Sequence, residues 1–393
     1  MAAKLTSLRI QGFRCIEDLT IRLDGLQVFI GENGSGKSTI VESFELLRRL
    51  ATPGRFAFDF YTRHGDLSEL RRSLAIPFRL TARCEEGEKL VEYSAELASS
   101  GVGLPSFAKE TLSRMGDIGQ FYPVFSRTGP DAMWRSASDG PTLGQRLSID
   151  QEQSAMLAPG IQDPSGEIEL VRRVFSSLDT FVPIEVGPLW AQPHELGTVR
   201  SLRNPTRPEP ARRLARDGSN ITSVYSTILA KGPDVNRAVL EDVRAGLGLD
   251  VSYVSVASPA PGQMQLRLHF GTREVPASQL SQGQLSYLLL VALKHLDHEA
   301  SAVIWDEPEL HLHPRLLTRA AWLFEEIAAR RPVLVMTHAD AFLDALDKPE
   351  RFVRVLTLDA SRRAVLNGID ADRLVEWRKM YHSLGEIRRD GML

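Results

Sequence analysis

The chain has 393 residues, of which 43% are hydrophobic and 25% are charged, a balance typical of a soluble globular protein with one large or two ordinary domains. The formal net charge of −3 argues against a surface coated with cations for nucleic acid. Two cysteines, Cys15 and Cys84, cannot supply a zinc site or a disulfide framework, which fits a reducing cytoplasm. The N-terminus lacks the apolar core of a signal peptide, and no stretch is apolar for long enough to span a bilayer, so any membrane role would need a partner.

The first hundred residues are predicted to be rich in β-structure around one helix. Alternating or continuous apolar runs, separated by turn residues, indicate the strands. The helix repeats apolar residues at helical spacing and ends near Leu50, before the breakers Pro53 and Gly54. The expected strands are residues 5–13, 19–23, 26–30, 76–82 and 90–97, the last two forming a hairpin.

Residues 31–38, Gly-Glu-Asn-Gly-Ser-Gly-Lys-Ser, match the phosphate-binding pattern G-x-x-x-x-G-K-[ST] at every fixed position. The glycines allow successive N–H groups to turn towards a phosphate, and the following helix adds the partial positive charge of its N-terminus. Lys37 is expected to reach the β- and γ-phosphates, and the Ser38 hydroxyl to bind Mg²⁺. A glycine-rich turn that is merely capped by Ser38 and Thr39 is the weaker interpretation, because a strand and a helix flank the loop. The predicted nucleotide contacts are Gly31, Asn33, Gly34, Ser35, Gly36, Lys37, Ser38 and Thr39.

The middle of the chain is less periodic. From Ser99 to about Gly166, frequent Gly, Pro, Ser and Asp predict irregular loops with short helices, including one over residues 107–115. Residues 167–178 and 234–245 are expected to form helices, and residues 181–186 a strand. No sustained heptads are present, which argues against a long coiled-coil arm.

A Pro-broken segment from His194 to Arg216 carries few acids. It could grip a phosphate backbone, or it could be a solvated loop, because it has no interleaved aromatic residues. Its cations are Arg200, Arg203, Arg207, Arg212, Arg213 and Arg216.

Three later motifs carry further chemistry. Leu280-Ser-Gln-Gly-Gln284 precedes a very apolar helix over residues 285–296, so Ser281, Gly283 and Gln284 are predicted to form a second phosphate site at a helix N-terminus. A buried strand over residues 302–305 then presents Asp306 and Glu307 at its C-terminal end. Asp306 would hold Mg²⁺ through water, and Glu307 would orient or activate the attacking water.

The third motif is Thr337-His338, which follows a buried strand over residues 333–336, and His338 could hydrogen-bond the γ-phosphate. Each motif has a plainer interpretation as a helix cap, a turn or a structural histidine. Their order along the chain favours chemistry. A P-loop, Leu-Ser-x-Gly-Gln, a strand with Asp-Glu and a strand with His are the parts of an ABC-type ATPase, in that order.

The chain more closely resembles the RecF/SMC-like ABC ATPases, in particular the soluble AAA-family ATPases related to OLD (overcoming lysogenization defect) proteins. The matching stretches are residues 8–14, 217–220, 306–314, 337–338 and 383–387 with Gly391. The resemblance implies that Arg14 touches the nucleotide phosphates and that residues 309–313 form the loop that crosses between subunits. Many relatives have Ser-Pro after the histidine, whereas this chain has Ala339-Asp340. The glutamine that couples nucleotide to partner is not evident; Gln120 is one candidate.

The resemblance implies an α/β ABC ATPase head, formed by residues 1–98 and 232–393 and interrupted by a recognition insertion at 99–231. It implies ATP and Mg²⁺ as ligands and a homodimer, or a higher oligomer, that shares two composite ATP sites. No TOPRIM nuclease domain is expected in this chain. The implied role is bacterial anti-phage defence or a toxin-type module, with a separately encoded effector such as a TOPRIM-type nuclease, and DNA as a further candidate partner.

Three alternatives to this role stay open. The chain could be a DNA-repair or DNA-end-binding ATPase, or a non-hydrolysing scaffold in which nucleotide only fixes the dimer. Glu307 argues against the scaffold. An ABC transporter subunit is the weakest alternative, because the P-loop and the Leu-Ser-x-Gly-Gln motif lie much farther apart here than is usual in transporters.

Overall fold

A computed structural model describes most of the chain: residues 3–73, 75–99, 104–116, 119–134, 144–159, 161, 163, 165–183, 202–297, 300–310, 312–370, 372–373, 376–377, 381 and 383–390. The chain divides into two compact units, each built from several segments. Unit 1 comprises Met1–Thr180, Glu299–Ile304 and Arg354–Asn367. Unit 2 comprises Phe181–His298, Trp305–Val353 and Gly368–Leu393. The predicted lobes have boundaries at residues 98 and 231, which differ from the boundaries of these two units. The predicted division stays a proposal.

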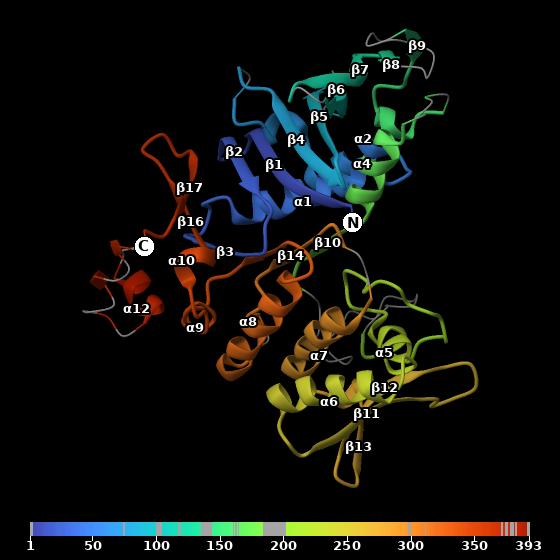
Figure 1. The fold of residues 1–393 in the computed structure, drawn as a ribbon, viewed down its shortest axis with the longest axis vertical. Helices are drawn as coiled ribbons and strands as arrows, with labels where there is room; N and C mark the ends of the chain where they lie inside the picture. Colours follow the sequence, from blue (N-terminus) through green and yellow to red (C-terminus); the bar gives the residue numbers. More distant parts are fainter. Residues whose placement is uncertain are drawn as a thin grey trace. The chain divides into compact units, whose positions relative to one another are not determined.

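Unit 1 is organised around an antiparallel sheet of eight strands, in the order β2-β1-β4-β5-β6-β7-β8-β9 (Figure 1). Almost every neighbouring pair is also consecutive in sequence, so short turns build most of the sheet. The predicted hairpin after residue 75 is confirmed as β4 and β5. The strands are β1 (Lys4–Phe13), β2 (Ile16–Arg22), β4 (Phe78–Glu86), β5 (Lys89–Ser99), β6 (Pro105–Met115), β7 (Phe121–Thr128), β8 (Asp131–Trp134) and β9 (Gln145–Ser148).

The two faces of this sheet differ, as alternation requires. On one face, apolar side chains such as Leu8, Leu80 and Tyr93 are fully or almost fully buried. The helices α1 (Lys37–Leu50) and α4 (Glu167–Ser176) pack against each other and against β1, so they cover this face (Figure 1). Burial of these apolar side chains stabilises unit 1 by roughly 25 cal/mol per Å² removed from water. Two shorter helices, α2 (Phe56–His64) and α3 (Leu67–Leu70), follow α1.

The expectation of a short helix at residues 107–115 was wrong, because these residues form β6. Two features hide the period-two pattern. A β-bulge opposite Glu96 and Leu97 shifts the register, and Glu110 occupies an inward position. Glu110 is fully buried, where Tyr93 and Ser154 donate hydrogen bonds of 2.6 and 2.7 Å to it. The irregular loops expected up to about residue 166 are in part the strands β6 to β9.

The remaining strands of unit 1 include the strand that leads into the P-loop. Strand β3 (Leu26–Gly31) lies beside β16 (Val353–Leu358), which pairs with β17 (Ala364–Gly368). Strand β10 (Leu178–Phe181) lies beside β14 (Ala302–Asp306). The strand predicted at residues 181–186 is wrong for residues 182–183, because β10 ends at Phe181, and residues 184–186 lie outside the described residues. Strands β3 and β14 are fully or almost fully apolar and buried, as expected for strands covered on both faces.

Unit 2 is mainly helical. The helix α7 (Gln282–His295) is buried on most sides because α5 (Ile221–Leu229), α6 (Pro233–Leu247) and α8 (Pro314–Ala328) all pack on it. Strand β15 (Val333–Met336) follows α8 in the chain. The small antiparallel sheet comprises β11 (Val251–Ala257), β12 (Gln265–Phe270) and β13 (Arg273–Pro276), and the other helices are α9 (Asp340–Asp344), α10 (Pro349–Phe352) and α12 (Leu384–Arg389).

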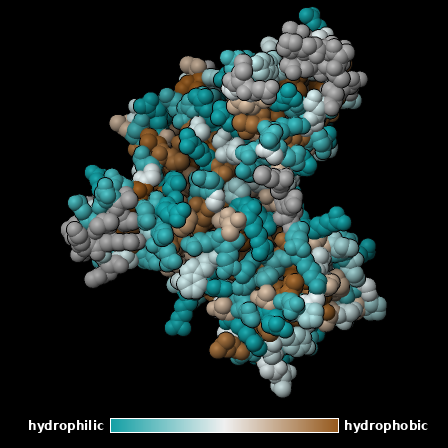
Figure 2. Space-filling model, in the orientation of Figure 1, coloured by the Kyte–Doolittle hydropathy of each residue, from teal (hydrophilic) through white to brown (hydrophobic). Residues whose placement is uncertain are grey.

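The described surface is mostly polar. Figure 2 shows apolar residues on the visible face as separate patches between hydrophilic ones. In the described parts of the chain, no helix has the length and apolar character needed to cross a membrane.

Candidate functional site

The P-loop has the backbone that its glycines predict. Strand β3 ends at Gly31 and helix α1 begins at Lys37, so the loop joins a strand directly to a helix N-terminus. Gly34 and Gly36 adopt φ values of 79° and 110°, a region that side chains with a Cβ rarely adopt. A Cβ at Gly31 would lie 2.2 Å from the carbonyl oxygen of Leu356. Glycine is therefore required here both for conformation and for space.

The side chains of the loop fit a bound triphosphate. The Lys37 ammonium donates hydrogen bonds to the carbonyl oxygens of Gly31 (2.7 Å) and Glu32 (2.9 Å), so its charge is held over the loop. The buried Ser35 hydroxyl has no hydrogen-bond partner in the described part of the chain. Ser38 is exposed at the first turn of α1, where its hydroxyl is accessible to a hydrated cation. The ammonium and the hydroxyl groups can donate hydrogen bonds to a phosphate, and the Ser38 oxygen can serve as a ligand of Mg²⁺.

Arg14 lies close to the P-loop helix. It adopts a positive φ of 51°, and its guanidinium pairs with Glu42 of α1 at 3.1 Å. His64 Nδ1 lies 2.5 Å from the same carboxylate. Glu42 follows Ser38 by one helical turn, so Arg14 is at the correct end of α1 for its predicted role. Its contact with nucleotide phosphates stays a prediction.

The Leu-Ser-x-Gly-Gln motif forms a complete capping box at the start of α7. The Ser281 hydroxyl accepts from the Gln284 backbone N–H at 3.2 Å, and the Gln284 side chain accepts from the Ser281 N–H at 2.8 Å. Both side chains are thus engaged at the helix end. The N–H groups of Gln282 and Gly283 belong to the first turn, whose N–H groups have no partner within the helix, and could receive an anion.

Glu307 follows the buried strand β14 in a strained conformation. Its φ is 48°, although it is not a glycine, and its N–H donates to the carbonyl oxygen of Met336 at 2.8 Å. A positive φ on such a residue costs on the order of 1 kcal/mol or more and often marks a functional position. The Glu307 carboxylate is about one-third exposed, and His338 Nε2 lies 3.9 Å from it. The structure thus brings two predicted residues, Glu307 and His338, together.

The loop that carries His338 is held by groups that sequence reasoning did not single out. The His338 N–H donates to Glu309 Oε1 at 2.5 Å. From α12, Arg388 donates to the His338 carbonyl oxygen at 2.7 Å and to Asp340 Oδ1 at 2.8 Å. Asp340 belongs to the Ala-Asp pair that departs from the usual Ser-Pro, so this ion pair gives the departure a structural role. Complementary charge was the only sequence signal, and the 48 positions between these two residues obscured it.

Only some of the described side chains in the arginine-rich segment, residues 194–216, are exposed to solvent. Arg203 is almost fully buried, at 3% exposure, and cannot face a nucleic acid. Arg207 and Arg212 are exposed, and Arg200 lies outside the described residues. The nearby Asn220 accepts from the Ala215 N–H and donates to the Arg213 carbonyl oxygen, so the Asp-Gly-Ser-Asn motif shapes this segment. The interpretation as a phosphate-gripping loop is therefore wrong for Arg203 and untested for the others.

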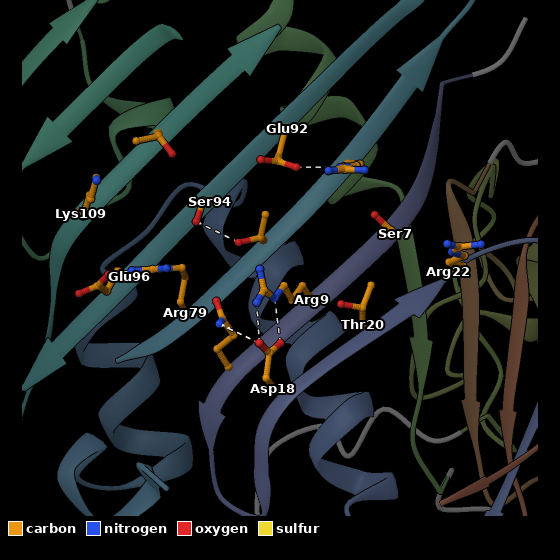
Figure 3. A pocket seen from close by; sticks show the side chains of 14 residues that line it. Ser7, Arg9, Asp18, Thr20, Arg22, Arg79, Glu92, Ser94, Glu96 and Lys109 are labelled. Carbon is orange, nitrogen blue, oxygen red and sulfur yellow. Dashed lines mark hydrogen bonds and ion pairs between the residues drawn. The ribbon is translucent and has the colours of Figure 1, made fainter. Parts of the chain in front are cut away.

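A separate hollow of about 710 Å³ lies on the polar face of the eight-stranded sheet (Figure 3). Three ion pairs cross its strands: Arg9–Asp18, Arg79–Glu96 and Arg83–Glu92. A charged ligand would have to compete with these pairs, so the hollow has the character of a solvated, ion-paired face. Gln120, proposed for nucleotide coupling, lies elsewhere, in the turn between β6 and β7.

Comparisons with known proteins agree with this geometry. Residues 4–99 match the family described as "AAA ATPase domain", and residues 195–344 match "AAA domain, putative AbiEii toxin, Type IV TA system". A relative from Thermus scotoductus (strain ATCC 700910 / SA-01), described as "OLD nuclease", is 24% identical over 392 residues. That match covers 92% of this chain and 64% of the relative.

Solved structures of SMC heads are also similar to this chain. An SMC head bound to the C-terminal winged-helix domain of ScpA matches with a TM-score of 0.46 at 14% identity, covering 95% of this chain and 99% of that one. The SMC head domain from Thermotoga maritima matches with a TM-score of 0.41 at 13% identity, covering 94% and 100%.

The strand–P-loop–helix unit is that of a P-loop ATPase of α/β class, in agreement with the AAA ATPase match. The chain is similar to these two AAA families and to an OLD nuclease, which agrees with the resemblance to OLD-related ATPases seen in the sequence.

Proposed function

We propose that this chain hydrolyses ATP and that ATP-dependent dimerisation lets it control a separate effector in an anti-phage or toxin-type module. Support for the biological role comes from the relatives, one described as "OLD nuclease" and one family described as "putative AbiEii toxin, Type IV TA system". The effector is proposed to be a nuclease of TOPRIM type. In the proposed assembly, Ser281 and Gly283 of one chain close on the γ-phosphate held by Lys37 and Ser38 of another.

The observation that carries the hydrolytic part is the backbone of Glu307. A left-handed glutamate at the end of a buried strand, with a histidine 3.9 Å away, is a costly arrangement that a turn alone does not require. We assign Glu307 the role of accepting a proton from the attacking water, and His338 the role of a hydrogen-bond donor to the γ-phosphate. Mg²⁺ would neutralise charge on the phosphates, and Ser38 and Asp306 are the residues that would hold it.

The test is a Glu307→Gln variant. The amide keeps the size of the side chain but cannot take a proton, so turnover should fall by roughly two or more orders of magnitude while MgATP still binds. Steady-state phosphate release and calorimetric ATP binding measure the two quantities. Glu241→Gln, an exposed change on α6, should leave both unchanged. Near wild-type turnover in the Glu307 variant would rule out its assignment as the base.

A further inference from the structure

The loop before the Leu-Ser-x-Gly-Gln helix is held by a buried cation. Residues 277–279 form a short 3₁₀ turn, and Leu280 is extended before Ser281 caps α7. Their carbonyl oxygens precede the helix and therefore do not belong to its hydrogen-bond ladder. Within the turn, the Leu280 N–H donates to the Ala277 carbonyl oxygen at 3.3 Å. The carbonyl oxygen of the buried Leu280 needs a donor from elsewhere in the fold.

Arg203 supplies that donor. Its Nη1 donates to the carbonyl oxygen of Leu280 at 2.6 Å, and it approaches those of Ala277 and Ser278 at 3.4 and 3.3 Å. Burial lowers the pKa of the guanidinium from its usual value, but arginine still keeps its charge. A charged donor makes stronger hydrogen bonds to carbonyls than a neutral one. The bond to Leu280 is thus the shortest of three contacts made by one guanidinium nitrogen, and it holds the residue directly before Ser281.

The segment that carries Arg203 is itself fixed to unit 2. Leu202 is 1% exposed, and Thr206 pairs with Met264 through two backbone hydrogen bonds of 2.8 and 2.7 Å. The Gln265 amide approaches both the Arg203 carbonyl oxygen and the Ser278 hydroxyl at 3.4 Å. Because the backbone around Arg203 is fixed, the Arg203 side chain can hold the loop that it contacts in a fixed position.

We propose that Arg203 is a positioning residue for the Leu-Ser-x-Gly-Gln motif, setting where Ser281 and the first N–H groups of α7 stand. This inference rests on the proposed composite ATP site. In that site, one chain contributes the P-loop and the other contributes the Leu-Ser-x-Gly-Gln motif. Arg203 contacts the loop before the motif, and an Arg203 variant keeps the P-loop sequence of its own chain. An Arg203 variant should therefore behave as a Ser281 variant does, and unlike a Lys37 variant.

The first test measures positioning directly. In the full chain, Arg203→Met should raise hydrogen–deuterium exchange in peptides that span residues 277–284 and leave peptides that span the P-loop unchanged. Arg203→Lys, which keeps the charge but not the planar guanidinium, should give a smaller rise. Arg207→Met, an exposed change four positions away, is the matched control and should change neither. Unchanged exchange at residues 277–284 in Arg203→Met would overturn the inference.

The second test assigns Arg203 to one half of the site. Arg203→Met alone should bind ATP normally but lose roughly tenfold or more in turnover, the loss expected for one charge-assisted hydrogen bond. Mixing it with Lys37→Ala should restore part of the activity, because one site then has two intact halves. Mixing it with Ser281→Arg should restore none, because every site then lacks an intact motif.

A control mixture separates this inference from the proposed function. Lys37→Ala with Ser281→Arg should recover activity if composite sites exist, and failure of that mixture contradicts the composite site itself. In that case, hydrogen exchange still decides whether Arg203 positions the motif. If the control mixture recovers but Arg203→Met with Lys37→Ala does not, the inference is wrong and the composite site stands.

Discussion

At the scale of single residues, the most informative side chain is Lys37. Its ammonium lies on the carbonyl oxygens of its own loop, at 2.7 and 2.9 Å, so the charge is already positioned over the backbone that would receive phosphate. Lys37 is also 7% exposed, which makes its charge less screened by water than that of a surface lysine. A phosphate that enters the loop meets a prepositioned cation and the unpartnered N–H groups of a helix.

Lys37→Ala should therefore lose most ATP affinity. A lost hydrogen bond to a charged group corresponds to about 1.5–3 kcal/mol, or roughly 10- to 100-fold in Kd. Calorimetric titration with MgATP measures this, and the exposed Lys348→Ala change should leave affinity as it is. ATP binding that is unchanged in Lys37→Ala would contradict the role given to the loop.

At the scale of elements, the helices of unit 2 are joined by a buried carboxylate. Asp242 of α6 is 4% exposed. It accepts from His295 at 2.6 Å, and Lys294 and Arg319 each lie 2.7 Å from it, so it links α6 to α7 and α8. Burial alone would raise the pKa of Asp242, but hydrogen bonds from His295 and Lys294 more than offset this and lower it to about 2. The packing of α7, which carries the Leu-Ser-x-Gly-Gln motif, depends on this carboxylate.

Asp242→Asn should destabilise the protein in a pH-dependent way. A carboxyl whose pKa is lowered on folding stabilises the folded state above its unfolded value near 3.9, and this contribution is lost as pH falls towards 2. At pH 7 the free energy of unfolding should fall by on the order of 2 kcal/mol, because the pKa of Asp242 is lowered to about 2 in the folded state. Urea unfolding at pH 7 and pH 3 measures the free energy of unfolding of both proteins. The difference from wild type should shrink at pH 3.

The matched control for this experiment is Asp234→Asn, on the same helix but with a 96% exposed side chain. It should change stability by less than about 0.5 kcal/mol at either pH. A gap between wild type and Asp242→Asn that is the same at pH 7 and pH 3 would show that the ion pairs are not the source of the effect.

At the scale of the whole molecule, the proposed dimer explains why the nucleotide should control assembly. In the proposed dimer, the second chain contacts only the γ-phosphate of the nucleotide. Because ADP lacks this phosphate, ATP should favour the closed dimer far more than ADP does. Light scattering of the Glu307→Gln variant, which should trap ATP, is expected to give a dimer with MgATP and a smaller species with MgADP. The same mass with both nucleotides would contradict assembly controlled by the γ-phosphate.

Sequence alone determined the parts whose signal is local. The P-loop lies within eight residues between a buried strand and a helix, and β14 and β15 are short continuous apolar runs. Their chemistry could be predicted because residue type and chain neighbours suffice to specify it. The resemblance to OLD-related ATPases rests on these same local motifs.

Only the tertiary structure decided what depends on distant partners. Strand β6 was not evident because its core position is filled by Glu110, which is tolerable only where Tyr93, Ser154 and Arg127 surround it. Arg203 looked like a surface cation because the carbonyl it holds, that of Leu280, lies 77 positions away. A charge or a carboxylate has no fixed meaning in sequence, because burial and partners set its energy, and folding alone brings those partners together.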